Sequence, residues 1–193
     1  MPTATKSELR ARLLAARKTA SSTIRDAEAE ALTSHLCAVT DAGATVCAYV
    51  PVGTEPGSLA LLDTLSRAGT RVLLPVAVTE DGIPQPLHWG EYRPGGLVRA
   101  DFGLKEPAGP HLPPATLAEA AIVIVPALAV DRRGVRLGRG AGFYDRSLPL
   151  RQPGARLIAV VRDDEVLDAL PADEHDVLMT HAVTPGRGVI ALG

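Results

Sequence analysis

The chain has 193 residues, of which 46% are hydrophobic, and its 22 acidic and 20 basic side chains leave a net charge of -2. This size and balance are typical of one globular domain, expected over residues 1–193, and they argue against binding to nucleic acid or an anionic membrane through bulk charge. The two cysteines are too few for a disulfide scaffold or a cysteine-rich zinc site, which favours a reducing, cytoplasmic setting.

Two helices are predicted within residues 6–39. Thr5 and Glu8 have the spacing of a capping box, so the first helix is expected to begin at Lys6. Ser21 and Ser22 precede a second apolar repeat of helical spacing. We expect both helices to pack on the remainder of the domain.

Four short apolar runs rich in β-branched residues follow, and each is bounded by glycine or proline. They are predicted as buried strands over 45–50, 71–76, 121–125 and 156–161, with helices over 59–67 and, more weakly, 144–150. The proline-rich segment 81–114 is interpreted as an edge hairpin followed by a long loop. The longest uncharged apolar run, 120–130, is well short of the roughly 20 residues that span a bilayer. This order predicts a three-layer α/β/α fold with a mainly parallel sheet.

A segment rich in glycine and arginine, residues 131–146, leaves the third predicted strand and leads into a helix. Ligands bind at the carboxyl ends of parallel strands in such folds. Gly138, Gly140 and Gly142 allow backbone N–H groups to approach an anion closely, and arginines suit phosphate oxygens. The donors expected from this pattern are Arg133, Arg136 and Arg139. The pattern therefore predicts a phosphate-binding loop.

Other interpretations of this loop stay open at this point. It has no Gly-Lys-Ser/Thr ending of a Walker A motif. A dinucleotide site is closer, because Asp163 and Asp164 lie near the separation expected of a ribose-binding acid, but Phe143 stands where the third glycine belongs. A solvated glycine-rich turn is the plain structural alternative.

Carboxylates beside a phosphate require a cation between them. Asp145 at the end of the loop, with Asp176 as a second candidate, suits Mg²⁺ shared with phosphate oxygens. Glu55 follows the first strand and is a candidate ligand-binding acid. No histidine has metal-ligand spacing, and no Ser or Cys has the context of a catalytic nucleophile.

Taken together, the motifs resemble the 5-formyltetrahydrofolate cyclo-ligase (5,10-methenyltetrahydrofolate synthetase) family over nearly the whole chain. The segments that carry the likeness are 6–10, 49–55, 102–107, 125–131, 134–146 and 175–176, of which the block Arg-Leu-Gly-x-Gly-x-Gly-aromatic-Tyr-Asp is specific. The resemblance implies a NagB/RpiA/CoA-transferase-like fold. It also implies ATP- and Mg²⁺-dependent conversion of 5-formyltetrahydrofolate to 5,10-methenyltetrahydrofolate, with release of ADP and phosphate. The sequence leaves a monomer and a homodimer both open.

The resemblance also assigns roles to residues of this sequence. For ATP it implies contacts by Lys6, Arg10, Arg136, Leu137, Gly138, Arg139, Gly140, Ala141, Gly142, Phe143 and Tyr144. Within that set it implies catalytic roles for Arg136, Arg139 and Tyr144. It places folate at Val50, Glu55 and Phe102, and Mg²⁺ at Asp145 and Asp176.

The sequence departs from the family pattern at Ala141, where many relatives have Lys or Gly, and at Phe143, where Tyr is usual. Where relatives have a lysine at the position of Ala141, that lysine's phosphate contact is expected from Arg139 in this chain. Two functions of other classes compete with the ligase: a dinucleotide-dependent oxidoreductase and a non-catalytic ATP-binding regulator.

Overall fold

The computed structural model describes residues 5–100, 103–174 and 176–193. An eight-stranded sheet has the order β15-β14-β12-β9-β1-β2-β5-β8, and the pairs from β14 to β2 are parallel. Its strands are β1 (Thr45–Cys47), β2 (Arg71–Val76), β5 (His88–Glu91), β8 (His111–Leu112), β9 (Ile122–Pro126), β12 (Arg156–Val160), β14 (His181–Thr184) and β15 (Gly188–Ala191). The expected α/β fold with a mainly parallel sheet is confirmed.

Four of these strands match the predicted apolar runs, although β1 ends at Cys47, three residues early. Sequence reasoning missed β14 and β15, which pair antiparallel at one edge. The other edge holds β5 and β8, both antiparallel to their neighbours.

The helices are α1 (Lys6–Thr19), α2 (Ser22–Ala38), α3 (Leu59–Arg67) and α4 (Phe143–Ser147). The capping box at the start of α1 is confirmed: the Glu8 amide donates to Thr5 Oγ1 at 3.3 Å, and the Thr5 amide donates to Glu8 Oε2 at 2.8 Å. The weaker predicted helix over 144–150 is divided. It forms the five-residue α4 and then a 3-10 turn, η3 (Leu148–Leu150). None of the helices in the described ranges has the length and apolar character to cross a bilayer.

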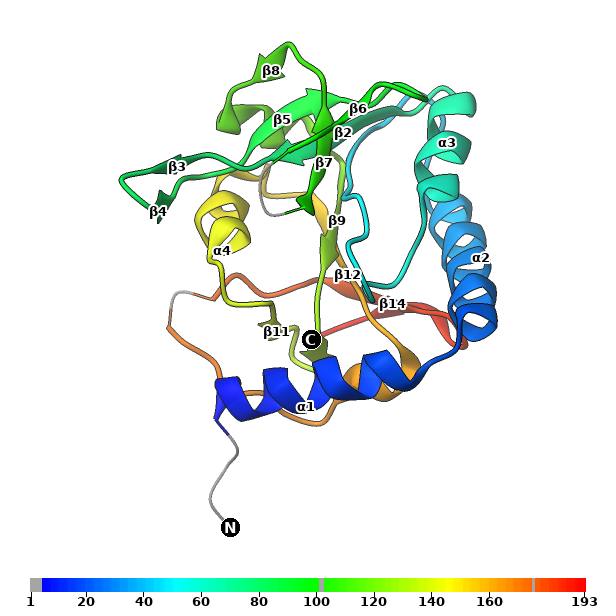
Figure 1. The fold of residues 1–193 in the computed structure, drawn as a ribbon, viewed down its shortest axis with the longest axis vertical. Helices are drawn as coiled ribbons and strands as arrows, with labels where there is room; N and C mark the ends of the chain where they lie inside the picture. The colour runs from blue at the N-terminus through cyan, green and yellow to red at the C-terminus, as the bar shows by residue number, and fades with distance from the viewer. Residues whose placement is uncertain (1–4, 101–102, 175) are drawn as a thin grey trace.

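Alternate residues of the central strands face opposite layers. In β9, Ile122 and Ile124 pack with the leucines of α2 and α3 on one face of the sheet. On the other face, Val123 and Val125 pack with residues of the 3-10 turns η2 (Pro114–Glu119) and η3. Figure 1 shows α2 and α3 together on one side of the molecule and α4 on the other. The layers bury both faces, as a mainly parallel sheet requires.

A second, three-stranded sheet holds α1 in place. Its strands, in the order β11-β10-β13, are β11 (Arg136–Leu137), β10 (Ala129–Asp131) and β13 (Val166–Leu167). Leu9 and Leu13 of α1 pack against this sheet through Val135 and Leu137. This packing, visible at the bottom of Figure 1, brings the first turns of α1 beside the segment that follows β11.

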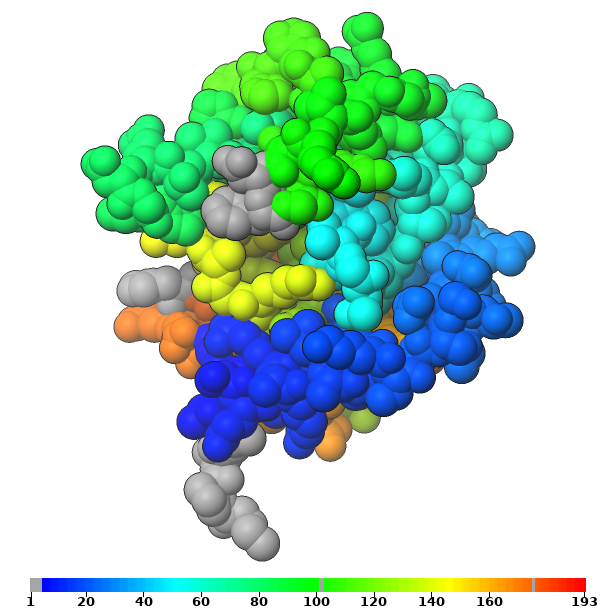
Figure 2. Space-filling view, viewed as in Figure 1, coloured from blue at the N-terminus to red at the C-terminus, as the bar shows by residue number. Residues whose placement is uncertain are grey.

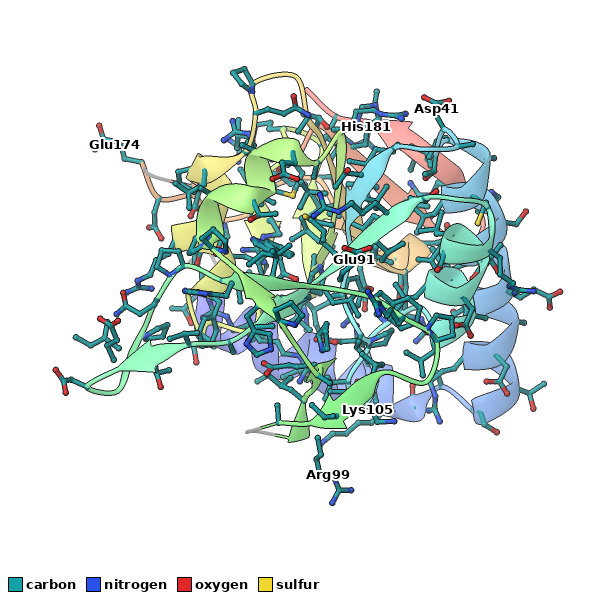
Figure 3. All side chains as sticks on the ribbon, turned by 90° about the horizontal axis from the view of Figure 1, so that it is seen from above. Asp41, Glu91, Arg99, Lys105, Glu174 and His181 are labelled. Atoms are coloured by element: carbon teal, nitrogen blue, oxygen red, sulfur yellow. The ribbon has the colours of Figure 1, made fainter. Side chains whose placement is uncertain are left out.

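The proline-rich segment 81–114 contains more strand than predicted. The antiparallel pair β3 (Thr79–Glu80) and β4 (Ile83–Pro84) projects from the body in Figure 1. The pair β6 (Leu97–Arg99) and β7 (Lys105–Pro107) replaces most of the expected long loop, and Arg99 and Lys105 lie at one margin in Figure 3.

Candidate active site

The segment from Arg136 to Asp145, called the glycine loop below, connects β11 to α4. Gly140 and Gly142 have φ values of +96° and +82°, in the left-handed region that favours glycine. A Cβ at Gly138 would lie 2.6 Å from Arg136 Nη1. These glycines therefore keep the backbone open beside the arginines, as the sequence predicted. With only five residues, α4 adds little dipole to this loop.

Arg136 is held in a fixed position at the start of the loop. Its side chain is 8% exposed, its Nη2 donates to Asp145 Oδ1 at 2.7 Å, and its Nη1 donates to the Pro126 carbonyl at 3.3 Å. The guanidinium carbon lies 5.6 Å from the centre of the Tyr144 ring. Three predicted site residues, Arg136, Tyr144 and Asp145, are thus brought into one cluster.

The Tyr144 hydroxyl is buried and has no hydrogen-bond partner among the residues that the structure describes. Burial raises the pKa of Tyr144 well above its ordinary value, and the charge of Glu55 adds to this shift. The group is therefore a neutral phenol at physiological pH. A buried donor without a partner is a costly arrangement for folding, and it suits a group that meets a ligand.

Arg139 connects the glycine loop to the segment after β1, residues 50–58, called the β1 loop below. Its Nε lies 2.9 Å from Glu55 Oε1, and its Nη2 donates to the Val52 carbonyl at 3.2 Å. Glu55 is 11% exposed, and its Oε2 accepts from the Val52 amide at 2.9 Å. The candidate folate acid is therefore a fixed carboxylate in direct contact with the glycine loop.

Lys6 and Arg10 of α1 reach the same region from the other side. Arg10 Nε donates to the Gly138 carbonyl at 2.9 Å. Lys6 Nζ lies 2.6 Å from Asp173 Oδ2 and 3.3 Å from Asp176 Oδ2. The hydrogen bond that Lys6 donates to Asp173 is the main cause that raises the pKa of Lys6. By contrast, Glu174 points away from the molecule at its edge in Figure 3.

The two candidate metal ligands each carry an ion pair with a base. Asp145 is 59% exposed and pairs with Arg136, and Asp176 is 21% exposed and pairs with Lys6. Within the described ranges, no group of three or more His, Cys, Asp or Glu side chains is placed to hold a metal. This donor set fits Mg²⁺ only when phosphate oxygens and water complete the coordination, which is the usual way that the ion binds beside a nucleotide.

A main cavity of about 530 Å³ opens between the glycine loop and the β1 loop. Figure 2 shows the hollow between the yellow and cyan surfaces. The predicted site residues that line it are Val50, Glu55, Arg136, Gly138, Arg139, Gly140, Ala141, Gly142, Phe143, Tyr144 and Asp145. Its volume suits ligands of drug size or larger.

Several predicted residues lie elsewhere. The side chain of Leu137 is buried in the core with α1, so only its backbone is available to a ligand. Lys6, Arg10 and Asp176 stand beside the main cavity and do not line it. Phe102 falls outside the described residues.

Arg133 is separated from the phosphate-binding set. Its guanidinium pairs with Asp131 Oδ2 at 2.9 Å and donates to the Leu170 carbonyl. Asp131 is completely buried; burial opposes its ionisation, but hydrogen bonds from the Leu170 amide and from Arg133 outweigh burial and lower its pKa. Arg133 thus helps to fix the β10 turn and does not line the main cavity, so its expected contact with phosphate has no support in the structure.

The acid needed for a dinucleotide site is also committed elsewhere. Asp163 accepts hydrogen bonds from Thr184 Oγ1 and from the Gly186 amide, and it faces Arg187. Neither Asp163 nor Asp164 lines the main cavity. The ribose-binding role on which that alternative depended has no support in the structure.

Sequence reasoning missed part of the wall of the main cavity. Arg17 of α1 is 1% exposed, and its Nε and Nη2 hold Glu165 at 2.6 and 2.7 Å. The β3–β4 pair contributes Thr79, Gly82 and Pro84. No signal along the sequence marks these contacts, because Arg17 and Glu165 are 148 positions apart and the hairpin has no motif.

Comparisons with known proteins point to one family. A model of the 5-formyltetrahydrofolate cyclo-ligase family matches residues 2–185. A 5-formyltetrahydrofolate cyclo-ligase of Mycolicibacterium smegmatis is 60% identical over 188 residues, covering 97% of both chains, and one of Escherichia coli is 31% identical, covering 74% of this chain and 79% of its own. The solved structure of Aquifex aeolicus 5,10-methenyltetrahydrofolate synthetase has a TM-score of 0.78 at 27% identity, covering 97% of this chain and 92% of its own. That of the Mycoplasma pneumoniae synthetase has a TM-score of 0.71 at 18% identity, covering 91% and 96%, and supports the fold alone.

Proposed function

The chain belongs to the 5-formyltetrahydrofolate cyclo-ligase family, and we propose that its glycine loop binds ATP with Mg²⁺ while the β1 loop binds the folate. Its function is that of the family, conversion of 5-formyltetrahydrofolate to 5,10-methenyltetrahydrofolate in folate metabolism. The family implies an ATP-dependent reaction, so the oxidoreductase and the non-catalytic regulator are set aside.

One observation carries the assignment of residues. Arg139 of the glycine loop and Glu55 of the β1 loop are in contact at 2.9 Å, and both line the main cavity. Phosphoryl transfer requires the donor and acceptor to be held in contact and in line. The contact supports two adjacent sites in one cavity, one for a triphosphate and one for the folate ring.

The chemistry explains why arginine and glycine are needed. The oxygen of a formamide is a poor leaving group, so it first receives the terminal phosphoryl group of ATP. The second folate nitrogen then attacks the activated carbon, the ring closes, and phosphate leaves with the former formyl oxygen. No protein nucleophile is required, which agrees with the buried state of Cys47 and with its pKa, which burial raises far above the usual value.

Arg136 and Arg139 would neutralise charge on the transferring group, and the backbone N–H groups beside Gly138, Gly140 and Gly142 would contact phosphate oxygens. Tyr144 would offer its unpaired hydroxyl as a neutral donor in the same cavity. Lys6 and Arg10 would approach the phosphates from α1. Arg139 and the loop backbone are held in place before the ligand arrives, which is the property that electrostatic catalysis requires.

Asp145 and Asp176 would hold Mg²⁺, which would supply positive charge beside the phosphates. In the free protein each acid is paired with a base of the predicted ATP site, Arg136 or Lys6. Release of those bases toward the phosphates would keep the charges balanced as the complex forms.

The test is a spectrophotometric assay for the methenyl product, run with and without ATP and Mg²⁺. We expect product only when both are present. Substrate carrying ¹⁸O in the formyl group should then give ¹⁸O-labelled inorganic phosphate. Product formed without ATP, or label recovered in water, would reject this chemistry.

A further inference from the structure

A second cavity of about 240 Å³ lies next to the main cavity. Arg17 and Glu55 line both, so they form part of the wall that the two cavities share. In Figure 2 the cyan surface of the β1 loop lies directly against the blue surface of α1 and α2, the elements that enclose this space. The two cavities are therefore neighbours, with Arg17 and Glu55 between them.

The acids and bases on the second cavity are mostly paired. Glu28 binds Arg162 at 2.6 Å, Glu55 binds Arg139 at 2.9 Å, and Arg17 binds Glu165 at 2.6 Å. In the described part of the chain, Arg25 and Asp26 are the charged lining residues without an ion pair. Both lie near the start of α2 and are exposed.

Two groups of uncommitted N–H donors meet there. Gly57, Ser58 and Leu59 line the cavity at the start of the nine-residue α3, where Ser58 makes no side-chain capping bond. The first N–H groups of a helix have no partner within the helix, and they favour anions.

The second group is independent of the helix. Arg17 Nη1 has no hydrogen-bond partner among the described residues, although the side chain is 1% exposed. Glu165 occupies Nε and Nη2, and the Ala127 carbonyl accepts from Nη2 at 2.6 Å. A buried guanidinium with one free nitrogen on the shared wall is a donor that a ligand would satisfy.

From these donors we propose that the second cavity is a carboxylate subsite, and that it receives a carboxylate of the glutamyl tail of the folate whose ring occupies the main cavity. The inference rests on the proposed function. A carboxylate fits better than a neutral group because Arg25, Arg17 Nη1 and the α3 N–H groups are all donors. Glu28 and Glu55 are neutralised by their arginine partners, so among the described lining residues Asp26 is the acid without an ion pair, and its removal should favour the tail.

The experiment compares two substrates with the same ring system. One is 5-formyltetrahydrofolate, and the other is its diamide, in which both tail carboxylates are carboxamides. Dissociation constants are measured by calorimetry, and KM by the methenyl assay. The variants are Arg25→Gln and Asp26→Asn, which are exposed changes on α2, with Arg67→Gln on the last turn of α3 as the matched control.

We expect the unmodified protein to bind the carboxylate form about threefold to tenfold more tightly than the diamide. Arg25→Gln should weaken, and Asp26→Asn should strengthen, binding of the carboxylate form only, while Arg67→Gln changes neither form. Equal affinity for the two substrates, or the same change for both in the variants, would overturn the subsite and leave the function intact. If neither substrate gives product with the unmodified protein, the proposed function itself fails.

Discussion

Glu55 and Arg139 form an ion pair of 2.9 Å that joins the β1 loop to the glycine loop across the main cavity. The same carboxylate accepts a hydrogen bond from the Val52 amide, and the same guanidinium donates to the Val52 carbonyl. The two loops therefore share one small polar network. The contact between Glu55 and Arg139 therefore fixes the two loops relative to each other.

We expect Glu55→Gln to weaken 5-formyltetrahydrofolate binding about tenfold to hundredfold, because hydrogen bonds to a charged acceptor are lost. Binding of a non-hydrolysable ATP analogue without folate should change less than about threefold, since the Arg139 guanidinium is retained. Both dissociation constants can be measured by calorimetry. Glu106→Gln is the matched control, because Glu106 lines the same cavity and its Oε1 accepts from the Ala77 amide at 2.8 Å. Equal losses in the two variants would contradict a specific role for Glu55.

Arg136→Ala and Asp145→Ala should each lower kcat/KM by about 2–4 kcal/mol of transition-state stabilisation, roughly thirtyfold to a thousandfold. Arg136→Ala removes a positive charge beside the transferring phosphoryl group, and Asp145→Ala removes a proposed ligand of Mg²⁺. Steady-state assays at saturating Mg²⁺ provide the measurement, and thermal melting shows whether the variants fold. Arg146→Ala serves as the control, because Arg146 is exposed and its Nη1 donates to the Gly142 carbonyl. Full turnover by Asp145→Ala would remove that residue from the mechanism.

Tyr144→Phe separates stability from catalysis. Because the buried hydroxyl has no partner among the described residues, its removal should leave the free energy of unfolding unchanged or raise it by about 1 kcal/mol. If the hydroxyl contacts the ligand, kcat/KM should fall about tenfold. Denaturant unfolding and steady-state kinetics on the same preparation test both statements. A less stable variant with normal turnover would show that the hydroxyl has a structural role instead.

Asp131→Asn should make stability depend less on pH. The folded-state pKa of Asp131 lies below the ordinary value of 3.8, so its stabilising effect is fully present above that pH and is lost as the pH falls through the folded-state value. At pH 7 the variant should lose about 3 kcal/mol, because the pair with Arg133 and three amide hydrogen bonds are disrupted. Unfolding by urea from pH 7 to pH 3 measures the difference from the unmodified protein, which should shrink at the acid end. A constant difference would contradict this assignment.

Local signals explain what the sequence predicted well. The capping box of Thr5 and Glu8 involves residues three apart, and it correctly placed the start of α1. Apolar runs marked β2, β9 and β12, because buried parallel strands are apolar throughout. The sequence also marked two parts of the lining of the main cavity. The glycine loop stands out because glycine and arginine are dense in a short segment, and Glu55 stands out because it follows the first strand.

Features that depend on distant partners were missed. Nothing along the sequence shows that Glu165 holds Arg17 in the interior. Arg133 was grouped with the phosphate donors, because the sequence does not show that Asp131 is buried and binds it. The edge strand β15 has four residues, and β3 and β4 have two each, so they are too short to show a period of two.

The most direct measurement for the central claim is a crystal structure of the protein with Mg²⁺, a non-hydrolysable ATP analogue and 5-formyltetrahydrofolate. We expect the terminal phosphate against Arg136 and the backbone of Gly138 to Gly142, with the folate ring beside Glu55 and its formyl oxygen facing that phosphate. A nucleotide bound away from the glycine loop, with the main cavity filled by folate alone, would contradict the account.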